Sequence, residues 1–281
     1  MRSPYPKKFK RKMWLFLGTL LILGTSAKAY FDTNVFKINK VQFQTNKIAA
    51  GSKITVLQIS DVHNKISRSQ HEKLIEAVIR VNPDVIVLTG DLVDRTTADL
   101  TNVFLFIEQL VEVNQNTFFV TGNHERDNSN VDELLAGLAD CGVTVLSNSN
   151  TEIMIRDSTI NLVGIDNEST NHENMNLAFS GIKHEKYTIL LSHSPGVVMN
   201  YQDIPADLIL SGHTHGGQIR LPLVGAIVAP NQGYFPKYDK GTFEIGSEQY
   251  IYIDSGLGTS VAPVRFWNQS QISLIEINGS N

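Results

Sequence analysis

The sequence predicts an α/β protein in which two mixed β-sheets pack face to face and helices cover their outer faces, a four-layer α-β-β-α sandwich. Short apolar runs alternate with amphipathic segments between Ile54 and Gly122, which is the pattern of parallel βαβ units. After Asp140, strand-like runs follow one another with fewer helices between them, which indicates two sheets in one continuous domain. The chain has 281 residues, of which 42% are hydrophobic, so it can bury one large core.

The spacing of the apolar residues assigns the individual elements. In the first half, strands are expected at 54–60, 84–90 and 117–122, and helices at 71–81 and 101–113, where apolar residues recur at helical spacing. In the second half, strands are expected in "GVTVLS", "TEIMIR", "TINLVGI", "YTILLSH", "DLILSGH", "QYIYID" and "QISLIEI". The segment before Ile54 contains a lead-in strand, "VFKINKVQF", so residues 30–281 are interpreted as a single domain.

Residues 1–29 are interpreted as a separate targeting segment. Six cations, Arg2 and those of "KKFKRK", precede the uncharged run "MWLFLGTLLILGTSA" (13–27), and "AKA" (27–29) suits a signal peptidase. A cleaved signal peptide and an uncleaved membrane anchor both fit, since a spanning helix needs about 20 apolar residues. In both cases the cations hold the N-terminus in the cytoplasm, so the domain is expected to be anchored outside the cell membrane or secreted.

The charge of the predicted domain argues against nucleic acid as its partner. Residues 1–29 hold seven of the 24 Lys and Arg and no acidic residue, so the remainder carries 17 cations against 28 acids, a net charge of −11. A body this acidic repels polyanions, whereas a small phosphorylated substrate remains compatible with it. The single cysteine, Cys141, excludes a cysteine-rich zinc site, so any metal must have nitrogen and oxygen ligands.

Polar clusters follow five of the expected strands. "DVH" (61–63), "GDLVD" (90–94) and "GNHE" (122–125) follow the first three, and His193 and "GHTH" (212–215) follow two strands of the second half. Ligands of open α/β sheets bind at the carboxyl ends of the strands, so these groups should meet at one rim. Turn chemistry explains each cluster alone, but together they offer the nitrogen and oxygen ligands that divalent metals prefer. His71, His172 and His184 lack such settings and are interpreted as solvent-facing or structural.

The composition of the clusters suits two ions better than one. Two divalent ions about 3.5–4 Å apart need a shared carboxylate, and Asp91 is central in the set. A water molecule that bridges two such ions loses a proton near neutral pH and becomes a nucleophile.

In this order, the five clusters resemble those of the calcineurin-like metallophosphoesterases, over residues 54–257. The stretches "GHTHGGQIRLP" and "DSGLGTSVAPVRFW" resemble the membrane-associated or exported bacterial branch of phosphodiesterases that includes UDP-2,3-diacylglucosamine hydrolases. The resemblance implies a metal-dependent phosphoric ester hydrolase. It would cleave a phosphomonoester or phosphodiester by attack of a metal-bridging hydroxide, on a small phosphorylated, phospholipid-like or nucleotide-sugar substrate.

The resemblance also implies a role for each residue. Asp61, His63, Asp91 and His215 would hold one divalent ion, and Asp91, Asn123, His193 and His213 would hold the other. His124 would protonate the leaving-group oxygen, and Asp94 would orient a ligand histidine. Glu125 fits a helix-start charge as well as a functional group. The ligand set accepts Mn, Fe and Zn alike.

Two alternatives stay open at this point. A non-catalytic exported module that binds metal is disfavoured, because a structural site needs neither His124 nor an open ligand position. The apolar stretch "LPLVGAIVAPNQGYFP" (221–236) is interpreted as a buried strand or hairpin. The competing hypothesis is a lipid-facing lip that, with the N-terminal anchor, presents the site to phospholipid headgroups.

Overall fold

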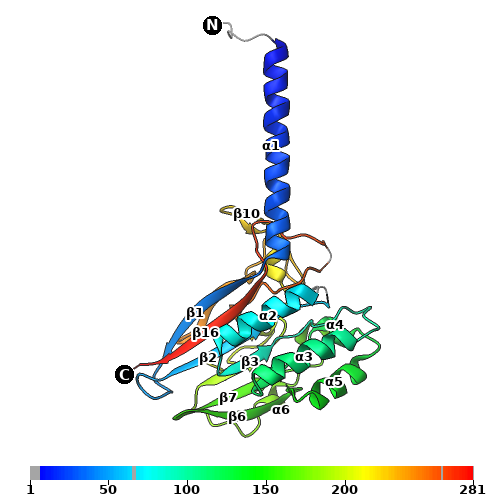
Figure 1. Ribbon diagram of the computed structural model, residues 1–281. Helices are drawn as coiled ribbons and strands as arrows, with labels where there is room; N and C mark the ends of the chain where they lie inside the picture. Colours follow the sequence, from blue (N-terminus) through cyan, green and yellow to red (C-terminus); the bar gives the residue numbers. More distant parts are fainter. Residues whose placement is uncertain (1–6, 65–67, 261, 281) are drawn as a thin grey trace.

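The computed structural model describes residues 7–64, 68–260 and 262–280, and two six-stranded sheets form its centre (Figure 1). Residues 1–6 of the predicted targeting segment, which include Arg2, lie outside the described residues. The two sheets are mixed, as the sequence predicts, because each combines parallel neighbours with an antiparallel pair.

The first sheet has the strand order β1-β16-β2-β3-β4-β5. Its strands are β1 (Lys37–Thr45), β16 (Gln271–Gly279), β2 (Lys53–Ile59), β3 (Val85–Leu88), β4 (Thr117–Phe119) and β5 (Thr144–Val145). Strands β2 to β5 run parallel to one another, and β16 runs antiparallel to β2. The lead-in strand expected before Ile54 is β1, which pairs in parallel with the last strand of the chain.

The second sheet has the strand order β14-β15-β9-β8-β7-β6. Its strands are β14 (Gly241–Gly246), β15 (Gln249–Ile253), β9 (Leu208–Ser211), β8 (Thr188–Leu191), β7 (Ser158–Gly164) and β6 (Ser149–Ile155). The four central strands are parallel, and the two edge strands are antiparallel to their neighbours. Together with β5 and β16 of the first sheet, these strands account for every strand expected in the second half.

Apolar side chains of both sheets meet in one core between them. Val56 and Val87 of the first sheet pack in the same cluster as Leu162, Ile189 and Leu210 of the second, and all five are buried. Strands buried on both faces read as continuous apolar runs, which is how "ITVLQIS" and "YTILLSH" appear in the sequence.

Helices cover the outer faces of the sheets, as Figure 1 shows for α2, α3 and α5. Helices α2 (Arg68–Val81), α3 (Thr101–Val113) and α5 (Val131–Asp140) pack on the first sheet through a second apolar cluster. The helices α6 (Met175–Ala178) and α7 (Val197–Asn200) cover the second sheet, and they have only four residues each. The predicted four-layer sandwich is confirmed, with a thin outer layer on its second side.

Two short hairpins follow the 3₁₀ turn η2 (His215–Gly217). Strands β10 (Arg220–Leu221) and β11 (Gly225–Ala226) form the first, and β12 (Val228–Ala229) and β13 (Gly233–Tyr234) form the second. We call residues 219–235 the lip. Hairpins are present here, as expected, but the expected burial is wrong. Seven large hydrophobic side chains of the lip are exposed, because neither hairpin is covered by another layer.

Helix α1 (Lys7–Asn34) projects away from the body of the domain (Figure 1). Within the described residues, its stretch Lys8–Asn34 is the one helix long and apolar enough to cross a membrane. Its last turn is held by the loop before β16: Arg265 N–H donates to Thr33 Oγ1 at 2.8 Å, and Ser270 N–H donates to Asp32 O at 2.8 Å. The helix therefore continues past residue 29, and its last turn is hydrogen-bonded to the domain.

Candidate metal centre

The seven predicted metal ligands gather at the carboxyl ends of the central strands. Asp61 and His63 follow β2, Asp91 follows β3, and Asn123 begins the short helix α4 (Asn123–Arg126) after β4. From the second sheet, His193 follows β8, and His213 and His215 follow β9. Both sheets thus contribute to one rim, as the parallel order of these strands requires.

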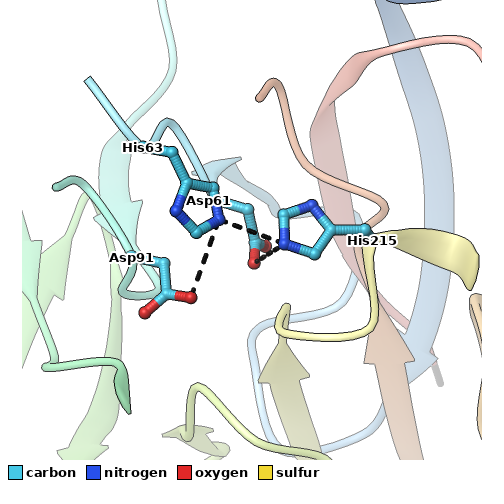
Figure 2. Close-up of side chains that lie close together, drawn as sticks. All are labelled: Asp61, His63, Asp91 and His215. Carbon is cyan, nitrogen blue, oxygen red and sulfur yellow. Dashed lines mark hydrogen bonds and ion pairs between the residues drawn. The ribbon is translucent and has the colours of Figure 1, made fainter. Parts of the chain in front are cut away.

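Asp61, His63, Asp91 and His215 form the first group of side chains (Figure 2). Each offers one ligand atom, and these four atoms lie within 4.8 Å of one another. His63 Nε2 lies 3.1 Å from His215 Nε2, and His215 Nε2 lies 3.4 Å from Asp61 Oδ1. All four residues are buried, so water does not screen the arrangement.

Asp91, His193 and His213 form the second group. His193 Nε2 lies 3.3 Å from Asp91 Oδ2 and 3.1 Å from His213 Nδ1. Asn123 adds a buried Oδ1 that has no hydrogen-bond partner in the described part of the chain. Because Asp91 belongs to both groups, the geometry places it where a carboxylate shared by two ions would stand.

The backbone at these positions is strained. Asp61, His63, Asp91, His213 and His215 all have left-handed φ values, between 50° and 68°, which side chains with a Cβ rarely adopt. Only glycine fits at position 90, where φ is +82°, because a Cβ there would lie 2.7 Å from His193 Nδ1. Such strain persists only where the surroundings over-determine it, and it concentrates at functional sites.

Hydrogen bonds on the far side of the rings aim two histidines at the centre. His63 Nδ1 lies 2.9 Å from Asp94 Oδ1, and His193 Nδ1 lies 2.7 Å from Thr89 O. A neutral imidazole that donates from Nδ1 presents the lone pair of Nε2, and this arrangement is general for metal-binding histidines. The donor set therefore fits divalent ions.

The electrostatics of the groups also fit cations. Burial raises the pKa of Asp91, but the charge and hydrogen bond of His193 and the charges of His63 and His124 together outweigh burial and hold that pKa well below its usual range. Burial lowers the pKa of His193, but Asp91, the charge of Asp61 and the hydrogen bond to Thr89 O together outweigh burial and bring the pKa to about 10. Burial, with the charge of His193, lowers the pKa of His213 to about 3. A divalent ion would replace the proton on His193 and bind the neutral His213 directly.

Glu125 has a structural role that the sequence did not decide. Its carboxylate is buried and accepts N–H bonds from Gly122 at 2.7 Å, Asp91 at 2.8 Å and Val93 at 3.1 Å. Burial, together with the nearby charge of Asp91, raises its pKa to about 7. Glu125 thus ties the loop that carries Asp91 to the loop that carries Asn123. Its place three residues after Gly122, as in a capping box, was the available signal.

Arg265 and Asn268 hold the second sheet's part of the site, and sequence reasoning missed both. Arg265 is fully buried and donates to Ser255 O at 2.6 Å and to Gly258 O at 3.0 Å. Asn268 Nδ2 donates to His215 O at 2.6 Å. No local pattern around "VRFWN" marks these contacts, because those of Asn268 join segments about 50 residues apart and those of Arg265 go to backbone oxygens of an irregular loop.

His124 lies at the edge of the groups. Its Nδ1 is 3.2 Å from Asp94 Oδ1, its ring meets that of His63 edge-on at 4.6 Å, and its own N–H donates to Asp91 Oδ1 at 2.9 Å. Burial lowers its pKa, and so does the charge of His63. The three remaining histidines lie elsewhere: His71 stacks on Phe106 of α3, His172 bonds Thr170, and His184 is exposed.

The family model described as calcineurin-like phosphoesterase matches residues 54–217, the part of the chain that carries all seven predicted ligands. The chain belongs to this family. It is therefore a metal-dependent phosphoric ester hydrolase, and its groups of Asp and His, which include a third formed by His63, Asp94 and His124, could bind divalent metal.

Relatives in bacteria and animals share the domain. It is 28% identical to the uncharacterized metallophosphoesterase YkuE of Bacillus subtilis, with 100% of both chains covered. A 30% identical relative in Bos taurus is named a transmembrane protein with metallophosphoesterase domain, and the match covers 78% of this chain and 52% of that one.

A solved structure shares the fold. The NAD nucleotidase (NadN) of Haemophilus influenzae superposes with a TM-score of 0.50 at 15% identity. The superposition covers 74% of this chain and 46% of the nucleotidase, so the chain spans about half the length of that protein. At this identity the likeness concerns the two-sheet architecture alone.

Proposed function

We propose that the chain is a binuclear phosphoesterase whose two metal ions are held by Asp61, His63, Asp91 and His215 and by Asp91, Asn123, His193 and His213. The observation that carries this proposal is the position of Asp91 in both ligand groups, since one buried carboxylate between two sets of imidazoles offsets the repulsion between two cations. Mn, Fe and Zn all suit the nitrogen and oxygen donors. When bound, the ions supply a nucleophile derived from water and neutralise charge on the phosphate oxygens.

The side chains of the chain prepare the site for in-line attack. Asp94 and Thr89 fix the rings of His63 and His193, and Glu125 fixes the backbone of Asp91, so little has to reorganise when the substrate binds. His124 stands beside both groups with 12% of its side chain exposed, which lets it reach a substrate oxygen. It donates a proton to the leaving-group oxygen as the phosphorus–oxygen bond breaks, and Asp94 holds the ring through Nδ1.

The proposal also covers location and substrate. The six cations before the apolar part of α1 hold the N-terminus in the cytoplasm, so the domain lies on the outer face of the membrane or is secreted. The likeness of "GHTHGGQIRLP" to the UDP-2,3-diacylglucosamine hydrolase branch supports a lipid or nucleotide-sugar phosphoester. The acidic body disfavours nucleic acid.

Metal removal and re-addition tests the reaction. The full chain in detergent is stripped of metal, and hydrolysis of p-nitrophenyl phosphate and bis-p-nitrophenyl phosphate is measured after Mn, Zn or Fe is restored. We expect turnover to return with two ions per chain, and the ratio of the two rates to separate monoester from diester preference. Two bound ions without turnover on any phosphate ester would favour the metal-binding module.

His124→Ala tests the proposed acid. We expect a rate loss of about 10²–10⁴-fold with the metal content unchanged, because general acid catalysis contributes about that much. The exposed His184→Ala is the matched control and should keep the normal rate. A His124→Ala variant with normal rates would remove His124 from the mechanism.

A further inference from the structure

An apolar pocket opens beside the first ligand group. It has a volume of about 350 Å³, and His215 belongs both to its lining and to that ligand group. The apolar part of the lining comes from the lip and from the loop before Arg265: Ile219, Ile227, Val228, Ala229, Pro230 and Ala262. The other lining residues with polar side chains are His215, Thr214, Gln218 and Ser260. Thr214 Oγ1 donates to Asp239 O, and Gln218 bonds Ala262 O and the N–H of Ser260, so the lining does not match the many hydroxyls and charges of a sugar nucleotide.

The lip beyond the pocket keeps large hydrophobic side chains exposed where the backbone disfavours them. Leu223 is fully exposed at φ 67°, Phe235 is 68% exposed at φ 54°, and Trp267 beside the lip is 53% exposed at φ 54°. Glycine or asparagine would be cheaper at a left-handed position in water. An exposed apolar patch of this kind marks a surface that meets an apolar partner.

Helix α1 places this surface at the level of a bilayer. Lys28 Nζ, the first charge after the apolar run of α1, lies 5.4 Å from the ring of Trp267. Trp267 lines a shallow groove in which the hydrophobic Leu221, Leu223 and Val224 stand beside the charged Arg220, Lys237 and Asp239. Lys and Trp settle at the membrane–water interface, so the hydrocarbon core would end close to these two residues. Figure 1 shows the β10 hairpin beside the lower end of α1, at the end of the domain from which the helix rises.

We propose that this pocket binds the aliphatic chain of a phosphate ester drawn from the bilayer, so that the substrate class is a lipid phosphate. The inference rests on the proposed function, because the phosphate must sit at the metal ions while the chain enters the pocket past His215. Each buried methylene contributes about 0.8 kcal/mol, which is about fourfold in affinity. The lip and α1 hold the opening of the pocket against the bilayer, which supplies such chains.

Two non-hydrolysable probes test the pocket by binding alone. Methylphosphonate and hexylphosphonate are titrated calorimetrically into the full chain, embedded in lipid nanodiscs and loaded with Mn. We expect hexylphosphonate to bind at least about 30-fold more tightly, which corresponds to burial of about half of its five additional methylenes, since full burial would give about 900-fold. Equal affinities would overturn the chain site and leave the metal centre standing. If neither probe binds, the proposed phosphate site fails and the inference falls with it.

Variants locate the effect. Ala262→Phe fills the pocket and Ile227→Ser makes its wall polar, so both should bring the ratio of the two affinities toward one. The exposed Ala98→Phe and Met154→Ser are the matched controls and should keep the wild-type ratio. Pocket variants that fold and keep the wild-type ratio would overturn the assignment of the pocket.

The bilayer as the source has its own measurement. Mass spectrometry of the protein isolated from membranes should find α1 intact, with a peptide that runs from Lys28 to Asp32 across the cleavage site predicted after Ala29. A mature chain that begins at Tyr30 would remove the anchor and overturn the bilayer as the source of the chain.

Discussion

The metal centre and the lip are neighbours in the sequence and opposites in character. His215 is 3% exposed and surrounded by carboxylates and imidazoles, whereas Leu223, eight residues later, is fully exposed and apolar. Both regions contain residues with left-handed φ values, so both depart from the backbone conformation of lowest energy. The difference teaches that strain in one loop serves two purposes: it aims polar ligands inward at the centre and presents hydrophobic side chains outward at the lip.

The largest effect should follow the loss of the carboxylate shared by the two groups. Asp91→Asn keeps the shape of the side chain and removes its charge, so both ions lose a ligand and the repulsion between them is no longer offset. We expect turnover to fall by at least about 10³-fold, as for other groups that stabilise transition-state charge. Metal content by atomic emission should fall with it. A variant that keeps two ions and normal rates would show that Asp91 does not bridge.

The free energy of unfolding should depend on pH through the buried carboxyl of Asp254. Burial raises the pKa of this carboxyl to about 6 from 3.8. The folded state therefore favours the protonated form, and the unfolded chain ionises first as the pH rises. The contribution of Asp254 to the free energy of unfolding therefore falls by about 3 kcal/mol between about pH 4 and pH 6 and stays constant above pH 6.

Asp254→Asn should remove that fall, as measured by urea unfolding of the metal-free protein at a series of pH values. The exposed Asp132→Asn serves as the control for a charge lost from the surface. If the difference between wild type and Asp254→Asn does not change with pH, Asp254 is not the group responsible.

Glu125→Gln should weaken the centre without touching a metal ion. The amide oxygen can take the place of Oε2 and accept from Asp91 and Gly122, but without a full charge, and the amide nitrogen then faces the N–H of Val93 in place of Oε1, so the loop that carries Asp91 loosens. We expect metal affinity to fall by about 10–100-fold, which is usual when a group that supports a ligand is changed. The exposed Glu133→Gln on α5 is the control. If the metal affinity is unchanged, Glu125 acts only as a negative charge at the start of α4 and does not support the centre.

The smallest effect on folding is expected at the lip. Leu223→Asn should leave the free energy of unfolding unchanged or raise it by up to about 1 kcal/mol, because the new residue tolerates the left-handed backbone better and no contact is lost. Leu210→Ala, in the core between the sheets, should cost about 2–5 kcal/mol in the same urea titration. A Leu223→Asn variant destabilised as strongly would show that the lip packs on another part of the protein in solution.

The elements that the sequence predicts well are those whose pattern is local. The continuous apolar runs predict β2, β3, β8 and β9, and the polar residues that end these strands predict the ligands of the centre. Parallel order does the rest, because it brings the ends of distant strands to one rim.

What the sequence does not predict depends on partners far along the chain. Glu125 reads as a helix-start charge because its acceptor role concerns backbone N–H groups of another loop. Arg265 and Asn268 show no local pattern, since their contacts cross between the C-terminal loop and η2. The lip reads as buried because apolar residues usually are, and only its position next to α1 gives the exposure a reason.

The last turn of α1 sets where a soluble form of this enzyme can begin. Asp32 is fully buried and accepts the N–H of Asn268, the residue that also holds His215 O, while Thr33 holds the N–H of Arg265. A form that starts at Val35, where strand β1 is about to begin, would leave Arg265 and Asn268 without these contacts. A form that starts at Tyr30 keeps them and still discards the apolar run, so it is the better of the two forms to produce.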